Sequence, residues 1–299
     1  MGKIRTLLVT GASGHLGRRV VGLVADAGRD RLVATTRNPD RLADVAKQGV
    51  EVRRADFDDP KSLPAAFAGA DRLLLVSTDA VDFPGRRIEQ HRAAIAAAKA
   101  AGVGHIVYTS FFTEPDPRFL VAADHWGTER ALAASGLAWT ALRHNLYAEY
   151  LAQLLPEAIE SGRLVAAAGE GGAAFVTRED CARAAAAALA SSDTSSRTLE
   201  IAGPAVVTLR EVATLAGELA GRRVSYVPVE PAALRAGMVA AGLPGHLADV
   251  LVSIHVAMAQ GKFRSTTSAV ADLTGRAPTS VPAFLSSRSD LLLAAPVAR

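Results

Sequence analysis

Short apolar runs alternate with helical patterns over the first 145 residues of the chain. The run "RLLLVS", residues 72–77, is apolar at most positions, which indicates a strand buried on both faces. Strands with this pattern are typical of a parallel sheet between two layers of helices. We predict strands over residues 4–10, 32–36, 51–55, 72–77, 105–110 and 138–143, and helices over residues 16–27, 41–48, 63–68, 86–101 and 125–135.

This alternation predicts an α/β fold with a doubly wound parallel sheet and right-handed crossovers. After residue 145 the alternation becomes irregular, and we expect a smaller mixed lobe over the carboxyl edge of the sheet, where such folds bind ligands. The segments expected there are a helix over 147–160, a strand and glycine-rich turn within 161–176, a helix over 178–190, a strand over 197–202, helices over 209–220, 232–241 and 247–260, and a closing segment over 274–285.

Three glycines with the spacing G-x-x-G-x-x-G separate the first strand from the first helix. One permits a tight turn, one lets the backbone approach a pyrophosphate, and one lets helix and strand pack closely. The start of the helix also offers unpaired N–H groups to phosphates. The sequence therefore predicts a dinucleotide site that involves Gly11, Ser13, Gly14, His15, Leu16 and Gly17.

The end of the second strand indicates which dinucleotide is bound. Enzymes that use NAD carry Asp or Glu there to accept a hydrogen bond from the ribose, but this chain reads "TTRNP". Arg37 within this stretch can instead pair with the 2′-phosphate of NADP(H), and Arg18 could assist. The alternative is that Arg37 is a solvated loop residue. We expect NADPH.

Two further strand ends supply candidate contacts to the cofactor. Asp56 and Phe57 follow the third strand, where a carboxylate could accept from the adenine amino group, although Asp is also common in turns. Ser77 and Thr78 end the fourth strand, beside the expected nicotinamide ribose.

These motifs together resemble the NmrA-like, atypical short-chain dehydrogenase/reductase family. The stretches that carry the resemblance are "VTGASGHLG", "TTRNP", "RADFDDP", "IVYTSF", "HWGTERAL", "WTALRHNLYAEY" and "LTGRAPTSVPAFL". Within the family, the chain looks most like bacterial NADPH-dependent quinone oxidoreductases of type 2 and triphenylmethane-dye reductases. The resemblance implies an NAD(P)-binding Rossmann domain over residues 1–145 and a smaller substrate-binding lobe over 146–299, of which some late segments can return to the sheet.

The chain departs from the wider family at the proton donor. Short-chain dehydrogenases usually carry a Tyr-x-x-x-Lys pair, and aligning on Glu129 puts Val121 and His125 at those two positions. His125 could bond the ribose or relay a proton near neutral pH, or it could be a half-exposed histidine at a helix start. Ser110 stands at the usual place of the reductase serine.

Loss of the tyrosine disfavours alcohol dehydrogenation and favours quinones, whose carbonyls accept a hydride readily. Such an enzyme mainly has to stack the ring against the nicotinamide, without flavin or metal. Phe111 and Phe112 could form the walls of the pocket or simply pack in the core. Asn145 and Tyr147 could hydrogen-bond a carbonyl oxygen. We therefore assign catalysis to Ser110, His125, Asn145 and Tyr147.

Two other functions stay open. The resemblance also allows a non-catalytic redox sensor that binds NADP(H) and a protein partner, because the missing tyrosine fits both readings. A reductase of a biosynthetic pathway would differ only in its substrate, which we expect to be small and hydrophobic or aromatic.

Composition and charge limit the classes of binding partner and metal site that we expect. The net charge is only +3, and the basic residues are scattered, so nucleic acid is not expected. The single cysteine, Cys181, excludes an intrachain disulfide and a cysteine-based metal site, and we expect it in the core. No apolar run approaches the ~20 residues of a membrane span. Because a strand begins at Ile4, no room remains for a signal peptide, and we expect a cytoplasmic protein. The sequence leaves open whether the chain forms a homodimer.

Overall fold

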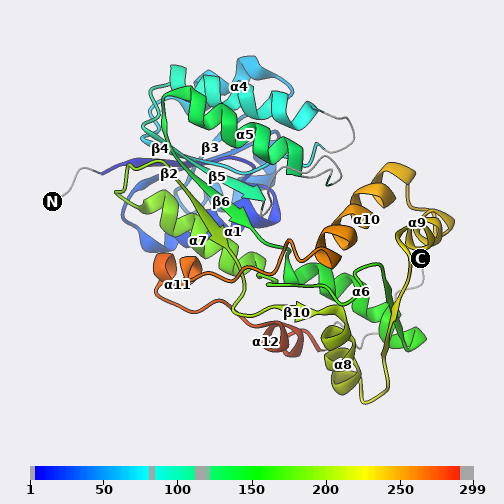
Figure 1. The fold of residues 1–299 in the computed structure, drawn as a ribbon. Helices are drawn as coiled ribbons and strands as arrows, with labels where there is room; N and C mark the ends of the chain where they lie inside the picture. The colour runs from blue at the N-terminus through cyan, green and yellow to red at the C-terminus, as the bar shows by residue number, and fades with distance from the viewer. Residues whose placement is uncertain (1–3, 81–84, 112–118, 120–121, 290–299) are drawn as a thin grey trace.

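A parallel sheet of seven strands is the centre of the fold (Figure 1). The computed structural model of the chain describes residues 4–80, 85–111, 119 and 122–289. The strand order is β3-β2-β1-β4-β5-β6-β9, and all six pairings are parallel. The strands are β1 (Thr6–Val9), β2 (Arg31–Thr36), β3 (Glu51–Arg54), β4 (Arg72–Leu75), β5 (His105–Phe111), β6 (Ala138–His144) and β9 (Arg197–Ile201).

The strand order reverses between β1 and β4. Leu8 of β1 is in register with Val33 of β2 on one side and with Leu73 of β4 on the other. The chain runs outward from β1 to β3, crosses back to β4, and runs outward again to β6 and β9. This arrangement confirms the predicted Rossmann-type doubly wound sheet. Sheets of this kind bind ligands at the carboxyl ends of the strands, next to the reversal.

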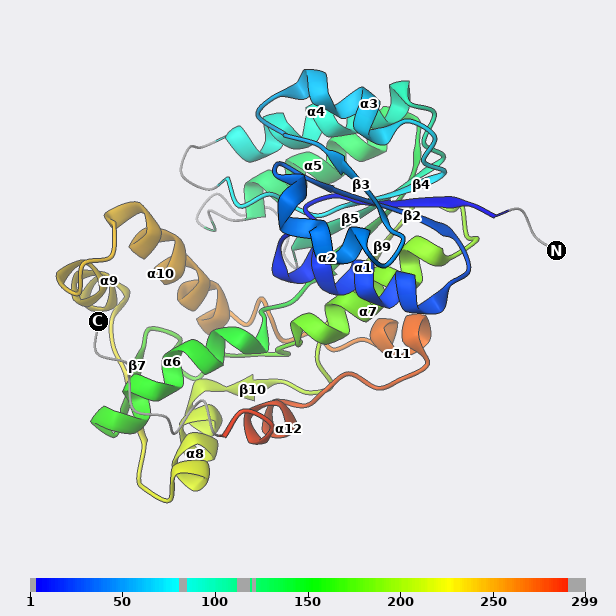
Figure 2. The same ribbon diagram turned by 180° about the vertical axis from the view of Figure 1, so that it is seen from behind.

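Helices cover both faces of the sheet (Figures 1 and 2). One buried cluster joins the sheet to α1, α2, α7 and α11, and another joins the opposite face to α3, α4 and α5. The predicted helix over 41–48 divides into a 3-10 turn and one short helical turn, since Pro39 and the side chain of Asn38 begin it early. The bounds are α1 (His15–Ala27), η1 (Pro39–Leu42), α2 (Ala43–Ala46), η2 (Pro60–Ser62), α3 (Leu63–Phe67), α4 (Arg86–Ala100), α5 (Ala122–Ser135), α7 (Arg178–Ala190) and α11 (Ala269–Thr274).

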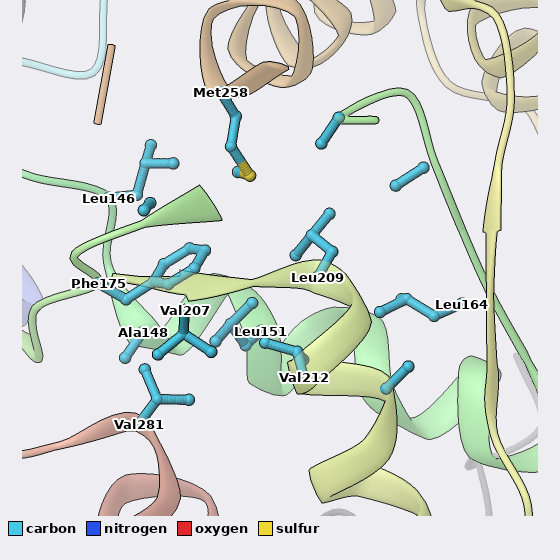
Figure 3. Close-up of a cluster of buried hydrophobic side chains, with 14 of the residues drawn as sticks. Leu146, Ala148, Leu151, Leu164, Phe175, Val207, Leu209, Val212, Met258 and Val281 are labelled. Atoms are coloured by element: carbon cyan, nitrogen blue, oxygen red, sulfur yellow. The ribbon is translucent and has the colours of Figure 1, made fainter. Parts of the chain in front are cut away.

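The remaining elements form a smaller mixed lobe with its own apolar core (Figure 3). Leu151 of α6 and Val212 of α8 are fully buried in this core, together with Met258 of α10. The elements of the lobe are α6 (Ala148–Ser161), β7 (Arg163–Ala166), β8 (Gly172–Ala173), β10 (Val207–Thr208), α8 (Leu209–Ala220), β11 (Ser225–Pro228), α9 (Pro231–Ala240), α10 (Gly245–Ala259) and α12 (Val281–Ser286).

The chain crosses between sheet and lobe more than once after residue 145. Strand β9 pairs with β6 at the edge of the main sheet, and α7 packs against α1. Thr177 caps α7 by accepting from the amide of Asp180 at 3.0 Å. Strand β11, which the sequence did not indicate, pairs in parallel with β7. The division of the chain at residue 145 stays a prediction.

Candidate active site

A cleft of about 590 Å³ opens at the carboxyl edge of the sheet, beside β3, β2, β1 and β4. Leu16 and Gly17 are absent from its lining. Leu16 packs on the core beneath α1, and Gly17 is buried between helix and strand. Nine of the eleven residues predicted to bind the cofactor line the cleft: Gly11, Ser13, Gly14, His15, Arg37, Asp56, Phe57, Ser77 and Thr78.

The glycine turn leaves the start of α1 open to an anion. Gly11 has a φ of +59°, and its carbonyl oxygen accepts from the amide of Gly14 at 3.0 Å, which closes the turn. Gly14 is the N-cap of α1 but has no side chain to cap it, and the first turn carries no acidic residue. The first amides of the helix therefore lack a side-chain partner, which suits the phosphates of a dinucleotide.

Three arginines line one end of the cleft: Arg18, Arg37 and Arg41. Arg18 pairs with Asp44 at 2.7 Å and also donates to the backbone carbonyl of Arg41. Arg37 is exposed and forms no ion pair with any residue that the structure describes. Its guanidinium is therefore available to a phosphate, while Asp56, Asp58 and Asp79 line the same cleft.

The other strand ends shape the walls of the cleft. An Asp56 carboxylate oxygen accepts from the amide of Asp58 at 3.1 Å, so this side chain stabilises a turn and lines the cleft as well. The amide of Thr78 donates to His91 at 3.1 Å. The Thr78 hydroxyl is buried and has no hydrogen-bond partner among the described residues. Such an orphaned hydroxyl in a cleft wall fits a site that a polar ligand completes.

A second pocket, of about 210 Å³, lies farther along the same sheet edge, where β5 and β6 end. Three of its residues were predicted from the sequence: Phe111, Asn145 and Tyr147; the predicted Phe112 lies outside the described residues. Apolar side chains dominate its walls, which suits an aromatic ligand. The full lining is Phe111, Asn145, Leu146, Tyr147, Tyr150, Gln153, Arg178 and Ile254.

Asn145 and Tyr147 are held firmly in this pocket. The Asn145 side chain donates from Nδ2 to the carbonyl oxygen of Phe263 at 3.1 Å, which leaves its second amide hydrogen unassigned. The Tyr147 hydroxyl lies 2.9 Å from Nδ1 of His144, and the Arg178 guanidinium lies 5.2 Å from the centre of the Tyr147 ring. Burial raises the pKa of Tyr147, so its hydroxyl keeps its proton.

Ser110 lines neither cavity. Its hydroxyl donates to Glu129 at 2.6 Å, and Arg143 holds the same carboxylate with two bonds of 2.9 and 2.6 Å. All three side chains are largely buried. The serine proton is therefore engaged by Glu129, and a catalytic role for Ser110 stays a prediction.

His125 is buried rather than half-exposed, because it is the fourth residue of α5 and its ring is enclosed by α4 and β5. Nε2 lies 3.4 Å from Arg87, which can only donate, so Nδ1 carries the proton and donates to the Tyr108 hydroxyl at 2.8 Å. Burial and the nearby Arg87 hold the pKa of His125 well below its usual value. The ring is neutral at pH 7. It contacts Phe111, with ring centres 5.9 Å apart, but it lines neither cavity. Val121 lies outside the described residues.

The sequence analysis missed several residues of the two cavities. Tyr150 and Gln153 follow Tyr147 at helical spacing, so an amphipathic reading of this helix could have found them. Arg178 and Ile254 come from α7 and α10, and no local signal connects them to the pocket.

The structure also bears on the cysteine, on metal sites and on membrane-spanning helices. Cys181 is fully buried on α7, as expected. Among the described residues, no group of three or more His, Cys, Asp and Glu side chains could hold a metal ion. None of the helices within the described ranges combines the length and apolar character that crossing a membrane requires.

Comparisons with known proteins agree with this architecture. Quinone oxidoreductase 2 of Escherichia coli (strain K12) is 36% identical over 276 residues, which cover 92% of this chain and 96% of that protein. The crystal structure of the E. coli NADPH-dependent quinone oxidoreductase QOR2 in complex with NADPH matches with a TM-score of 0.88 at 35% identity, over 94% of this chain and 98% of that one. Triphenylmethane reductase of Citrobacter sp. matches with a TM-score of 0.87 at 30% identity, over 96% and 100% of the two chains.

A comparison with models of protein families gives the same result. A family model described as the NmrA-like family matches residues 3–285, which is nearly the entire chain. The resemblance inferred from the sequence motifs is therefore confirmed. The chain belongs to the NmrA-like family.

Proposed function

We propose that the chain is an NADPH-dependent oxidoreductase that transfers a hydride to a quinone or a similar conjugated acceptor. The observation that carries this proposal is the order of two cavities along one sheet edge. The cleft with the glycine turn borders β3 to β4, and the aromatic pocket borders β5 and β6. A dinucleotide that extends from the arginines toward β4 would bring its reactive end next to the aromatic pocket.

The residues of the cleft fit NADPH. The uncapped start of α1 would bind the pyrophosphate, and Arg37, with Arg18 and Arg41 beside it, would bind the 2′-phosphate. Ser77 and Thr78 lie where the nicotinamide ribose is expected, and the orphaned Thr78 hydroxyl can bond it. The solved structures of the E. coli and Citrobacter relatives in complex with NADPH or NADP(H) support this assignment.

The second pocket fits a flat conjugated acceptor. When bound, NADPH supplies the hydride. Phe111 and Ile254 would exclude water and hold the acceptor ring in place, which makes the transfer effectively unimolecular. The free amide hydrogen of Asn145 and the hydroxyl of Tyr147 would stabilise the negative charge that develops on an acceptor oxygen. The names of two relatives, a quinone oxidoreductase and a triphenylmethane reductase, support an acceptor of this class.

The test is NADPH oxidation, followed at 340 nm, with the purified chain. The panel contains benzoquinone, menadione, a triphenylmethane dye and a control without acceptor. Oxidation that depends on a quinone, well above the control rate, supports the proposal. Tight NADPH binding without oxidation by any acceptor contradicts it and indicates a protein that senses NADP(H).

A further inference from the structure

Two tyrosines of the smaller pocket are each bonded to a buried histidine. Tyr147 is the N-cap of α6, with extended backbone, and Tyr150 lies in the first turn of the helix; both line the smaller pocket. The Tyr147 hydroxyl lies 2.9 Å from Nδ1 of His144, and the Tyr150 hydroxyl lies 2.8 Å from Nε2 of His255. The histidines come from β6 and α10 and are 2% and 1% exposed.

The second nitrogen of each histidine ring has no partner within the described part of the chain. Nε2 of His144 and Nδ1 of His255 are buried without a hydrogen bond to any described residue. Burial lowers the pKa of His144 to about 3 and that of His255 to about 4, so both rings are neutral near pH 7. A neutral imidazole carries a single N–H, which must lie on one nitrogen or the other.

The position of that proton follows from the missing partners. Either tautomer leaves one hydrogen without an acceptor: the second ring N–H, which is buried, or the phenol O–H of a tyrosine that lines the pocket. A buried N–H without an acceptor is rare, whereas a ligand in the pocket can accept from a phenol. The proton therefore belongs on the nitrogen that faces the tyrosine, which is Nδ1 in His144 and Nε2 in His255. Each imidazole then donates to the oxygen of its tyrosine. Neither phenol hydrogen is then used by the histidine, which leaves it for an acceptor in the pocket that both tyrosines line.

We propose that Tyr147 and Tyr150 form a pair of hydrogen-bond donors that binds both oxygens of a dione acceptor, with His144 and His255 as positioning residues that fix the direction of each bond. This inference rests on the proposed function. In the reaction, the quinone gains a hydride and one proton to become a hydroquinone, while NADPH becomes NADP⁺. The proton comes from water, because burial raises the pKa of both tyrosines, that of Tyr150 to about 12.

The pair would favour diones over acceptors that lack two oxygens. Negative charge on the acceptor oxygens grows during hydride transfer, so the two donors bind the transition state more strongly than the ground state. Tyr150 and His255 are thus specificity residues that the sequence did not indicate. Phe111 and Ile254 supply the apolar surroundings in which such bonds are strongest.

The kinetic test compares Tyr150→Phe with the matched variant Tyr226→Phe, which removes another buried hydroxyl from the lobe, away from both cavities. We expect Tyr150→Phe to lower kcat/KM for menadione about three- to tenfold and to leave the Kd for NADPH unchanged. Tyr226→Phe should change neither. A loss of less than twofold in Tyr150→Phe would overturn the inference.

The histidine variants test positioning apart from folding. His255→Gln keeps an N–H that can reach the tyrosine oxygen, whereas His255→Leu removes it. We expect the KM for menadione to rise in the leucine variant and to stay near the wild-type value in the glutamine variant. Equal KM values in the two variants would mean that His255 only packs, which overturns its positioning role.

A measurement that needs no turnover separates this inference from the proposed function. In ¹⁵N spectra of the full chain with labelled histidines, we expect the Nδ1–H tautomer for His144 and the Nε2–H tautomer for His255. The opposite tautomer at either residue overturns the inference even if menadione is reduced. If the wild-type chain reduces no acceptor, the proposed function fails, whereas the tautomers still decide whether the two donors are oriented.

Discussion

A Cβ atom on Gly17 would lie 2.4 Å from the carbonyl oxygen of Gly11. Gly11 lies in the turn between β1 and α1, and Gly17 is the third residue of α1, so the backbone at neither position can move aside without shifting the helix start. The third glycine of the motif is thus required for close packing of helix and strand, while the first two shape the cleft. This contact fixes where the uncapped end of α1 points.

Gly17→Ala should therefore weaken NADPH binding and stability together. The added methyl group displaces the start of α1, so we expect a lower Tm and at least a tenfold higher Kd for NADPH. Gly22→Ala is the matched control on the same helix, because its Cβ would meet only the tip of Arg19 at 3.9 Å. The control should leave the Kd unchanged and gain up to about 1 kcal/mol of stability. Equal behaviour of the two variants would contradict the packing role.

Arg37→Asp should shift the preference of the chain from NADPH toward NADH. The change removes a charge-assisted bond of about 1.5–3 kcal/mol to the 2′-phosphate and adds a repulsive carboxylate, so the Kd for NADPH should rise about 10- to 100-fold. Isothermal titration with both dinucleotides measures the effect. Arg130→Asp, which makes the same charge change on the exposed surface of α5, is the control. An unchanged Kd for NADPH in Arg37→Asp would refute the assignment.

Ser110→Ala should reduce stability more than activity. The hydroxyl donates to the buried Glu129 carboxylate, and its loss should cost about 1.5–3 kcal/mol of unfolding free energy. Because the serine lines neither cavity, kcat should fall less than tenfold. Ser135→Ala on α5 removes bonds to neutral backbone groups only, one donated to the carbonyl of Leu132 and one accepted from the amide of Leu137, and should cost less stability. A fall in kcat of a hundredfold or more would instead establish Ser110 as catalytic.

Stability should fall as the pH is lowered below about 6.5. Burial lowers the pKa of His91 and His144 to about 3 and that of His105 and His255 to about 4. Unfolded histidine takes up a proton near pH 6.5, so between pH 6.5 and 4 the unfolded chain binds more protons than the folded one. The folded state is therefore favoured above this range and loses stability within it.

Urea unfolding at pH 7.5 and pH 5 measures this effect. We expect a lower midpoint at pH 5, and His105→Gln should show a smaller difference between the two pH values than the wild-type chain. A midpoint that is the same at both pH values would show that the histidines are not neutral in the folded state.

The sheet and the glycine turn could be predicted because their signals are local. A strand buried on both faces is an apolar run, as in "RLLLVS", and the turn places three glycines within seven residues. Strand β11 has no such signal. It has only four residues, ends in Pro228, and exists because β7, some sixty residues earlier, offers it an edge.

The residues of the candidate site likewise fall into those that the sequence could predict and those that it could not. The cofactor residues follow strand ends and could be inferred from position, whereas the partners of the pocket residues could not. His255 lies 105 residues from Tyr150, and Ser110 is engaged by a carboxylate that only the packing of α5 on the sheet brings near. Such pairs depend on tertiary contacts that no spacing along the chain encodes.

Direct transfer of a hydride between the two cavities is the central claim, and an isotope effect tests it most directly. The rate of menadione-dependent NADPH oxidation is measured with NADPH that carries deuterium at one or the other C4 position. The account predicts slower oxidation with deuterium at one position and an unchanged rate with deuterium at the other. Equal rates with both forms, or oxidation that does not depend on the acceptor, would contradict it.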